Sequence, residues 1–306
     1  MKILITGIAG FIGSKLAKSF QKSGHTIVGI DDLSTGYKKN LPPNVIFYKF
    51  NITDKKKLFK LKGNFDQIFH CAGQTSIEKS FEDPLLDLNG NLISTINIIN
   101  FGIQRNVKKL IFASSVTAYG HQSNKKVKEE NILLPLTCYG ASKVAAENYI
   151  KIFSNKLPYV ILRLNNIYGH GQDMNNLKQG MISIYLSQAL KKNNIEVKGS
   201  TERYRDFMYI EDVVNIWKII SRKKTIKNMT FNVGTGKKTK VKTVLSLIKN
   251  NFKGLKTYIT SPTRGDQFGN QVDISKLKKK LNYKKFINLK SGLKQFIFDE
   301  RNSRIK

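Results

Sequence analysis

The chain has 306 residues, of which 40% are hydrophobic and 24% charged, a composition that is typical of a globular protein and argues against wholesale disorder. No stretch approaches the length of apolar sequence that a membrane span needs, and glycines interrupt the short apolar run after Met1 too early for a signal peptide. Two cysteines, Cys71 and Cys138, are too few for a disulfide framework. We therefore expect a protein of the reducing cytoplasm with no membrane partner.

The formal net charge of +32 is the extreme feature of the composition. Only 8 of the 53 basic residues are arginine, whereas bidentate recognition of phosphates and guanines favours arginine. The lysines are also spread along the whole chain in short pairs rather than gathered in one segment. We interpret the charge as compositional bias and do not expect a nucleic-acid partner.

Short segments rich in β-formers alternate with helical patterns through the first half of the chain. The predicted strands cover residues 2–6, 26–31, 45–50, 65–72, 109–115 and 159–165. The predicted helices cover residues 11–23, 84–105 and 139–153. Near-continuously apolar strands that alternate with helices indicate a doubly wound parallel sheet of the Rossmann type, covered on both faces.

The alternation breaks at about Gly169, where asparagines and glycines cluster. We therefore predict a Rossmann domain over residues 1–168, rejoined by about 207–233, and a smaller mixed α/β domain over 169–306. No internal repeat or low-complexity linker separates the two.

A glycine-rich segment, Gly7-Ile8-Ala9-Gly10-Phe11-Ile12-Gly13, follows the first predicted strand and opens the first predicted helix. Glycine is needed where the backbone turns tightly and where a pyrophosphate approaches the amides of a helix N-terminus. Asp31 ends the next strand, where an acid accepts the ribose hydroxyls and repels a 2′-phosphate. The segment predicts a dinucleotide site that favours NAD over NADP.

Two further motifs carry hydroxyl and amino groups. Tyr139 and Lys143 lie four residues apart and therefore on one face of a helix, where an ammonium can lower the pKa of a phenol that acts as a base. Ser115 stands at the carboxyl end of the strand 109–115, where ligands of open α/β sheets bind. A hydroxyl there can bond both to the phenol and to a substrate hydroxyl.

With these motifs the chain resembles the extended short-chain dehydrogenases/reductases, and among them the UDP-glucose 4-epimerase-like enzymes of the NAD-dependent epimerase/dehydratase family. The resemblance also includes the segments at 31–36, 70–74, 163–169, 205–214, 231–236 and 264–267, in the order of the family. It implies a homodimer whose subunits meet through the helices 84–105 and 139–153.

The resemblance implies a role for each matching residue. The catalytic residues are Ser115, Tyr139 and Lys143. The residues that bind NAD are Gly7, Gly10, Phe11, Ile12, Gly13, Asp31, Asp32, Asn51, Ile52, Ala72, Gly73 and Asn91, together with Tyr139 and Lys143. The residues that bind the nucleotide sugar are Gln74, Ser115, Thr117, Asn166, Arg205, Arg264, Asp266 and Asn270.

The implied reaction is epimerisation of a UDP-hexose or UDP-N-acetylhexosamine at C4. Tyr139 takes the proton of the C4 hydroxyl, Lys143 binds the nicotinamide ribose and lowers the tyrosine pKa, and Ser115 orients the hydroxyl. Asn270 stands beside the C2 substituent in the resembled family, and an asparagine there leaves room for an N-acetyl group.

Other functions stay open at this point. A 4,6-dehydratase or a decarboxylase of the same superfamily needs an acid just after the strand-end hydroxyl, where this chain has Val116 and Thr117. A simple nucleotide-sugar oxidoreductase is the nearest enzyme alternative. A non-catalytic NAD-bound scaffold or RNA-binding protein has no need of the complete catalytic trio. The four histidines show no metal-ligand spacing, so we expect no metal.

Overall fold

The structure, a computed structural model, describes residues 1–120, 126–262, 268–269 and 271–303. The chain divides into two compact units. Unit 1 comprises Met1–Gly120, Ile132–Arg163 and Val214–Phe231, and unit 2 comprises His121–Asn131, Leu164–Val213 and Asn232–Lys306.

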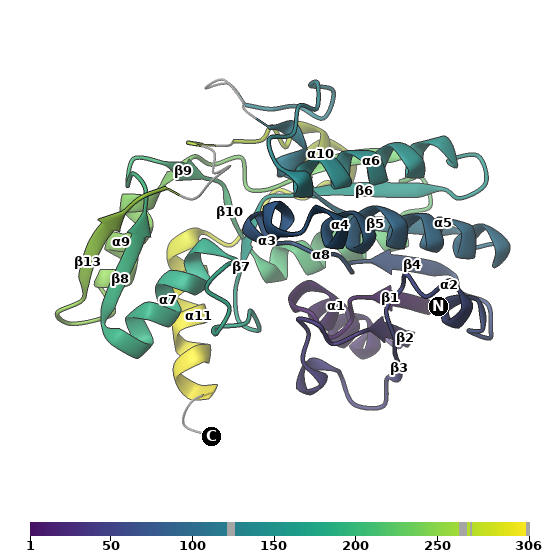
Figure 1. Cartoon of the computed structure of the whole chain (residues 1–306), viewed down its shortest axis with the longest axis horizontal. Helices are drawn as coiled ribbons and strands as arrows, with labels where there is room; N and C mark the ends of the chain where they lie inside the picture. Colours follow the sequence, from purple (N-terminus) through teal and green to yellow (C-terminus); the bar gives the residue numbers. More distant parts are fainter. Residues whose placement is uncertain (121–125, 263–267, 270, 304–306) are drawn as a thin grey trace. The chain divides into compact units, whose positions relative to one another are not determined.

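A seven-stranded sheet runs through unit 1 among the described residues (Figure 1). Its strands, in spatial order, are β3 (Ile46–Lys49), β2 (Thr26–Asp31), β1 (Lys2–Thr6), β4 (Gln67–His70), β5 (Lys109–Ser115), β6 (Tyr159–Leu164) and β11 (Met229–Val233). The pairs β3–β2, β2–β1, β1–β4 and β4–β5 are parallel. This order reverses direction next to β1, as in doubly wound dinucleotide-binding folds, and confirms the predicted fold class.

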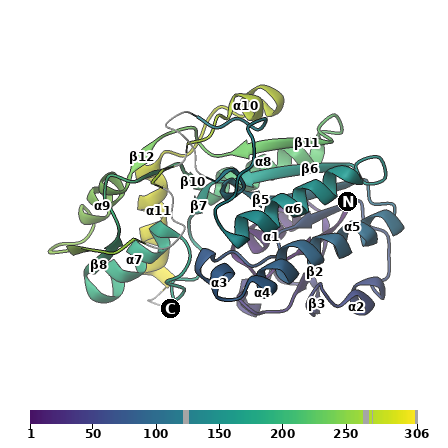
Figure 2. The ribbon, with the colours of Figure 1, turned by 45° about the horizontal axis from the view of Figure 1, so that its top comes forward.

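Helices cover both faces of this sheet because its strands are apolar on both sides. On one face α2 (Lys55–Phe59), α5 (Ser94–Gln104) and α6 (Cys138–Ile152) bury Leu58, Ile98 and Ile150 in one core cluster with strand residues such as Ile68. Figure 2 shows α5 and α6 side by side. On the other face, the ring of Phe69 in β4 contacts Phe20 of α1 (Phe11–Lys22) and Trp217 of α8 (Ile210–Arg222).

The segment predicted as one helix over 84–105 is interrupted. It consists of α4 (Pro84–Leu88), a π-helical turn (Asn89–Ile93) and α5. Asparagine and glycine are weak helix formers, and the hydroxyls of Ser94 and Thr95 bond back to the carbonyls of Gly90 and Asn91 at 2.6 and 2.5 Å. π-Helical turns occur frequently at functional sites, and this one carries the fully buried Asn91.

Three short helices complete unit 1. They are α3 (Ile77–Glu82) and the 3₁₀ turns at Lys38–Asn40 and Val116–Tyr119.

Unit 2 consists of small sheets and helices. Its strand pairs are β7 (Asn166–Tyr168) with β10 (Phe207–Tyr209), β8 (Asn194–Lys198) with β13 (Lys256–Thr260), and β9 (Tyr204–Arg205) with β12 (Thr239–Lys240). Its helices are α7 (Met181–Lys192), α9 (Val241–Lys249), α10 (Ser275–Leu281) and α11 (Leu289–Ser303). In the part of the chain that the structure describes, no helix has the length and apolar character to span a bilayer.

Candidate active site

The glycine-rich turn between β1 and α1 is packed too tightly for side chains. Gly7 has φ of 68°, and a Cβ on it would lie 2.7 Å from the amide nitrogen of Ala72. A Cβ on Gly13 would lie 2.1 Å from the carbonyl oxygen of Gly7. No side chain caps the N-terminus of α1 and no acid lies in its first turn, so its amides are available to an anion. The turn therefore fits the pyrophosphate of NAD, with Gly10, Phe11 and Ile12 at its helix end.

Asp31 is fixed beside that turn by backbone amides. Ala9 donates to its Oδ2 at 2.9 Å and Leu33 to its Oδ1 at 2.8 Å, while burial raises the pKa of the carboxyl. The next acid, Asp32, accepts a hydrogen bond from Asn51 Nδ2 at 2.8 Å. The structure thus joins Asp32, which follows β2, to Asn51, which follows the neighbouring strand β3. Ile52, which follows Asn51, is buried in the core.

Gly73 lies between two other predicted cofactor residues. A Cβ on it would lie 2.4 Å from Asn91 Oδ1 and 3.3 Å from Lys143 Nζ. No described residue donates a hydrogen bond to this buried Asn91 oxygen. The backbone amide of Ala72, the residue before Gly73, donates a hydrogen bond to Thr6 Oγ1 at 3.3 Å. The structure therefore brings Gly73, Asn91 and Lys143 together.

Ser115 and Tyr139 meet at the carboxyl end of β5. The Thr137 hydroxyl caps the first turn of α6, which carries Tyr139. Ser115 Oγ accepts hydrogen bonds from the hydroxyl and the amide of Thr117, at 2.9 and 3.2 Å. Hydrogen bonding from Ser115 acts to lower the pKa of the Tyr139 phenol, which favours the phenolate. Thr117, predicted to bind substrate, here orients Ser115.

Burial dominates the electrostatics of the pair on α6. Burial raises the pKa of Tyr139 to about 12, and the negative charge of Asp87 raises it further. The hydrogen bond from Ser115 acts in the opposite direction and lowers it. Burial also lowers the pKa of Lys143 to about 8, mainly against the charge of Asp87. The sequence led us to expect a tyrosine pKa lowered by Lys143. In the chain alone the shift is upward, because desolvation of the phenolate outweighs its neighbours.

Lys143 is held by contacts along its side chain. Nζ donates to the carbonyl of Ala113 at 3.1 Å and lies 4.9 Å from the centre of the Phe112 ring. It lies 5.8 Å from the centre of the Tyr139 ring. The carbonyl of Ala113 in β5 therefore accepts one of its three protons.

Gln74, predicted to bind the sugar, is held within unit 1. Its Nε2 donates to Asp87 Oδ1 and to the carbonyl of Ser76, both at 2.8 Å, and its Oε1 accepts from the Ser76 amide. Asp87 also accepts from Ser142 Oγ at 2.6 Å. The sequence analysis did not single out Asp87 or Ser142, because 55 residues separate them and only the packing of α4 on α6 joins them.

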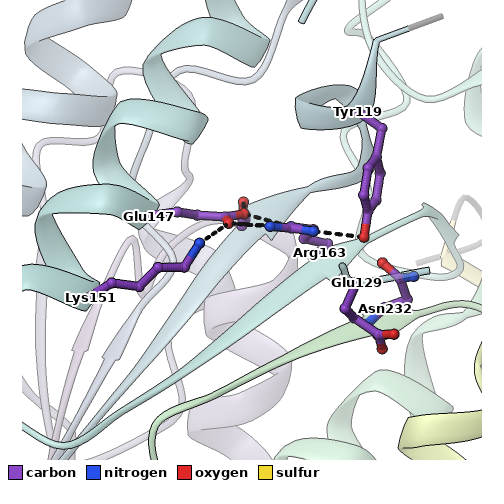
Figure 3. Close-up of polar contacts among 7 residues, drawn as sticks. Tyr119, Glu129, Glu147, Lys151, Arg163 and Asn232 are labelled. Atoms are coloured by element: carbon purple, nitrogen blue, oxygen red, sulfur yellow. Dashed lines mark hydrogen bonds and ion pairs between the residues drawn. The ribbon is translucent and has the colours of Figure 1, made fainter. Parts of the chain in front are cut away.

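A buried ion pair lies next to the end of β5 (Figure 3). Glu147 receives hydrogen bonds from Nε and Nη2 of Arg163, at 2.9 and 2.7 Å, and from Ser114 Oγ at 2.6 Å. Arg163 Nη1 donates to the Tyr119 hydroxyl at 2.7 Å. Burial lowers the pKa of Arg163, but the hydrogen bonds and charge of Glu147 outweigh it and raise that pKa above its ordinary value. The pair ties β6 and α6 to the residue that precedes Ser115.

Sequence reasoning missed this cluster as well. A signal for it exists, since Glu147 lies four residues after Lys143 and thus on the helix face that carries both catalytic side chains. A charged residue on a face that packs against a sheet needs a buried partner.

Two of the predicted substrate residues lie in the described part of unit 2. Asn166 donates through Nδ2 to Asn165 Oδ1 at 2.8 Å. Arg205 is buried and donates through Nη1 to the carbonyls of Tyr204 and Phe268, at 2.8 and 3.3 Å. The predicted residues Arg264, Asp266 and Asn270 lie outside the described residues. Among the residues that are described, no group of histidines, cysteines and acids has the arrangement of a metal site.

Comparison with known proteins identifies the family. Residues 3–234 match the NAD dependent epimerase/dehydratase family. The chain belongs to this family. The match confirms the resemblance seen in the sequence, an enzymatic role and NAD as the cofactor.

Individual relatives cover nearly the whole chain. A putative UDP-glucose 4-epimerase of Methanocaldococcus jannaschii is 34% identical over 303 residues, 96% of this chain and 97% of the relative. The crystal structure of a UDP-glucose 4-epimerase from Thermotoga maritima with UDP-glucose matches with a TM-score of 0.95 and 31% identity, over 99% of this chain and 100% of that one. A UDP-N-acetylglucosamine 4-epimerase from Methanobrevibacter ruminantium, in complex with UDP-N-acetylmuramic acid, matches with a TM-score of 0.92 and 27% identity, over 99% and 98%.

Proposed function

We propose that the chain is a nucleotide-sugar 4-epimerase that acts on UDP-hexoses or UDP-N-acetylhexosamines with tightly bound NAD. The observation that carries the proposal is the meeting of Ser115, Tyr139 and Lys143 at the carboxyl end of β5. There a hydroxyl donor, a phenol and a buried ammonium converge. The relatives named UDP-glucose and UDP-N-acetylglucosamine 4-epimerases support the substrate class.

The glycine turn, Asp31, Asp32, Asn51, Gly73 and Asn91 are the residues that would hold NAD, and their geometry fits it: backbone amides face outward at α1 and a buried amide oxygen is left without a donor. NAD, when bound, supplies the hydride acceptor for C4 and, in its oxidised form, a positive ring charge.

The chain itself moves the proton. Tyr139 accepts the proton of the C4 hydroxyl and returns it after the 4-keto sugar has turned over. Ser115 stabilises the phenolate by hydrogen bonding, which acts to lower the pKa of Tyr139. Lys143 contributes positive charge beside the ring, with Nζ 5.8 Å from its centre. Because burial works against the phenolate, this donor and this charge are both needed.

A dehydratase or decarboxylase is disfavoured by the residues after Ser115. Water elimination needs an acid and a base in that turn. Val116 is buried and apolar, and the Thr117 hydroxyl is bonded to Ser115. Neither side chain titrates near neutral pH. A non-catalytic NAD-bound scaffold or RNA-binding protein would not require Ser115, Tyr139 and Lys143 to converge.

The sugar nucleotide would be held by Asn166 and Arg205 of unit 2 and by Arg264, Asp266 and Asn270, which lie outside the described residues. The asparagine at position 270 is the basis for proposing that N-acetylated sugars are accepted beside UDP-glucose and UDP-galactose. An unchanged ratio of kcat/KM for the two sugar classes in Asn270→Tyr would remove Asn270 from the pocket.

The assembly proposed is a homodimer formed through α4, α5 and α6. Leu85 and Ile152 are each 70% exposed, and Leu86, Leu88 and Tyr149 are also exposed on these helices. Apolar side chains gathered on adjoining helices mark an interface, and the resemblance implies a second copy as the partner. The unpaired thiols of Cys71 and Cys138 fit the cytoplasm as its location.

The proposal is tested by the protein's own cofactor and products. Mass spectrometry of the nucleotide released from purified protein should find NAD. A screen of UDP-, dTDP-, CDP- and GDP-sugars should then give C4 epimers without added NAD, with UDP-sugars best. A dehydrated, decarboxylated or net-oxidised product as the main outcome would overturn the epimerase assignment.

A further inference from the structure

Asp87 is a buried acid outside the predicted catalytic set. It lies in α4 and is 1% exposed. Ser142 donates to its Oδ2 at 2.6 Å, and Gln74 and Asn91 donate to its Oδ1 at 2.8 and 3.1 Å. None of these donors is charged. The carboxylate is therefore satisfied by hydrogen bonds, while its negative charge still acts on its surroundings.

The group on which it acts is Lys143, the neighbour of Ser142 in α6. Lys143 is 3% exposed, and burial alone works against its charge. Asp87 is the foremost of the anions that oppose this effect.

The other titratable groups around Lys143 are neutral or already paired. The charge of Glu147 is met by two hydrogen bonds from Arg163. Burial raises the pKa of the Cys71 thiol and of the Tyr139 phenol to about 12 and lowers the pKa of the His70 ring to about 3, so these three are uncharged at neutral pH. Asp87 is thus the acid whose charge remains for Lys143.

The hydrogen bonds of Asp87 also fix the direction of the Asn91 amide. A carboxylate only accepts, so Nδ2 of Asn91 faces Asp87 and Oδ1 must face away from it. That oxygen lies against Gly73, where an added Cβ would also lie 3.3 Å from Lys143 Nζ. Asp87 thus orients two groups: the amide of Asn91, whose oxygen lies near the Lys143 ammonium, and the hydroxyl of Ser142, the residue before Lys143 in α6.

We propose that Asp87 is a positioning residue that acts as the internal counter-ion of Lys143, keeping it charged in the buried site and holding Ser142 and Asn91 in place. This role rests on the proposed function and deepens it, because the phenolate of Tyr139 depends on the charge of Lys143.

The test is the titration of Lys143 itself, followed by NMR of isotope-labelled lysine in the NAD-bound protein, with the resonance assigned by its loss in Lys143→Met. In Asp87→Asn, which keeps the size and polarity of the side chain, the pKa of Lys143 should fall by about one unit or more. Ser142→Ala removes a hydrogen bond but keeps the carboxylate, and should change this pKa little.

Asp83→Asn is the matched control. Asp83 is exposed at the start of the same helix, where it accepts from the Leu86 amide at 2.8 Å, and asparagine caps a helix as well as aspartate does. The Asp83→Asn substitution removes a negative charge, as Asp87→Asn does, and should leave the pKa of Lys143 unchanged. Asp87→Ser serves as a second neutral variant if the asparagine does not fold.

Turnover gives an independent readout. The charge of Asp87 also raises the pKa of Tyr139, so the readout is the pH dependence and not the absolute rate. Because Lys143 is protonated below its pKa, the ratio of kcat in Asp87→Asn to kcat in wild type should be highest at about pH 6 and fall as the pH rises. A Lys143 pKa that shifts no more in Asp87→Asn and Asp87→Ser than in Asp83→Asn would overturn the proposal. The titration requires no epimerase activity, so an inactive protein would break the proposed function and leave this result readable.

Discussion

Unit 1 buries two carboxylates against α6, and it satisfies them in different ways. Glu147 is fully buried and forms an ion pair with Arg163, so its charge is cancelled where it lies. Asp87 is equally buried but meets only neutral donors, from Gln74, Asn91 and Ser142. A buried carboxylate that is paired with a cation stabilises the fold. A buried carboxylate without a paired cation instead acts through its charge on a neighbouring titratable group. Glu147 should therefore contribute mainly to the free energy of unfolding, and Asp87 mainly to the protonation state of Lys143.

The largest expected effect is on the cancelled pair. Arg163→Leu leaves Glu147 buried without its cation, and should lower the free energy of unfolding by about 3–5 kcal/mol. The double variant Arg163→Leu/Glu147→Gln should lose less than the sum of the two single variants, because neither charge is then left alone. Urea unfolding followed by circular dichroism measures both.

Lys151→Met is the control for this pair. Lys151 reaches Glu147 Oε2 at 3.5 Å but is 37% exposed, so its loss should cost less than about 1 kcal/mol. If Arg163→Leu were no more costly than Lys151→Met, the pair could not be what joins β6 to α6.

The glycine turn at residues 7–13 contains no charged side chain, so substitutions there test close packing and not charge. Gly13→Ala places a Cβ 2.1 Å from the Gly7 carbonyl oxygen, so the turn must open, at a cost of about 1–3 kcal/mol. The purified variant should also contain less NAD than wild type, measured after release by acid. Gly24→Ala is the counterpart: it carries the strain of a positive φ, 77°, which Gly13 does not have, but meets no atom within 4 Å, and its NAD content should stay at the wild-type level. Equal NAD content in both variants would remove the turn from the cofactor site.

The smallest effect on stability is expected at Asp87. Its three partners are neutral and asparagine can bond to them, so Asp87→Asn should lower the free energy of unfolding by about 1 kcal/mol or less in urea. If Asp87→Asn lowered the free energy of unfolding as much as Arg163→Leu does, Asp87 would be a residue that mainly stabilises the fold, as Glu147 is, and the proposed difference between them would be wrong.

The sequence predicted those features that depend on local spacing. The glycine turn, the acid at the end of β2, the strand-end Ser115 and the Tyr139–Lys143 spacing each involve only a few neighbouring residues. The doubly wound sheet follows from the alternation of apolar strands and helices. The π-helical turn at Asn89–Ile93 was missed because its pattern of apolar residues is that of a continuous helix.

Long-range packing was beyond such reasoning. Asp87 reaches Ser142 only because α4 packs on α6. Arg163 reaches Glu147 only because α6 packs on β5, which is the neighbour of β6 in the sheet. The upward shift of the Tyr139 pKa was missed for the same reason, since the extent of burial is a property of the folded unit and not of the Tyr-x-x-x-Lys spacing.

Tyr139 is proposed as the base of a C4 epimerisation, and the decisive variant for this role is Tyr139→Phe. The variant keeps the ring and loses the hydroxyl, so it should retain its NAD while the kcat for interconversion of UDP-glucose and UDP-galactose falls by several orders of magnitude. Near-native interconversion of the two sugars by Tyr139→Phe would contradict the account.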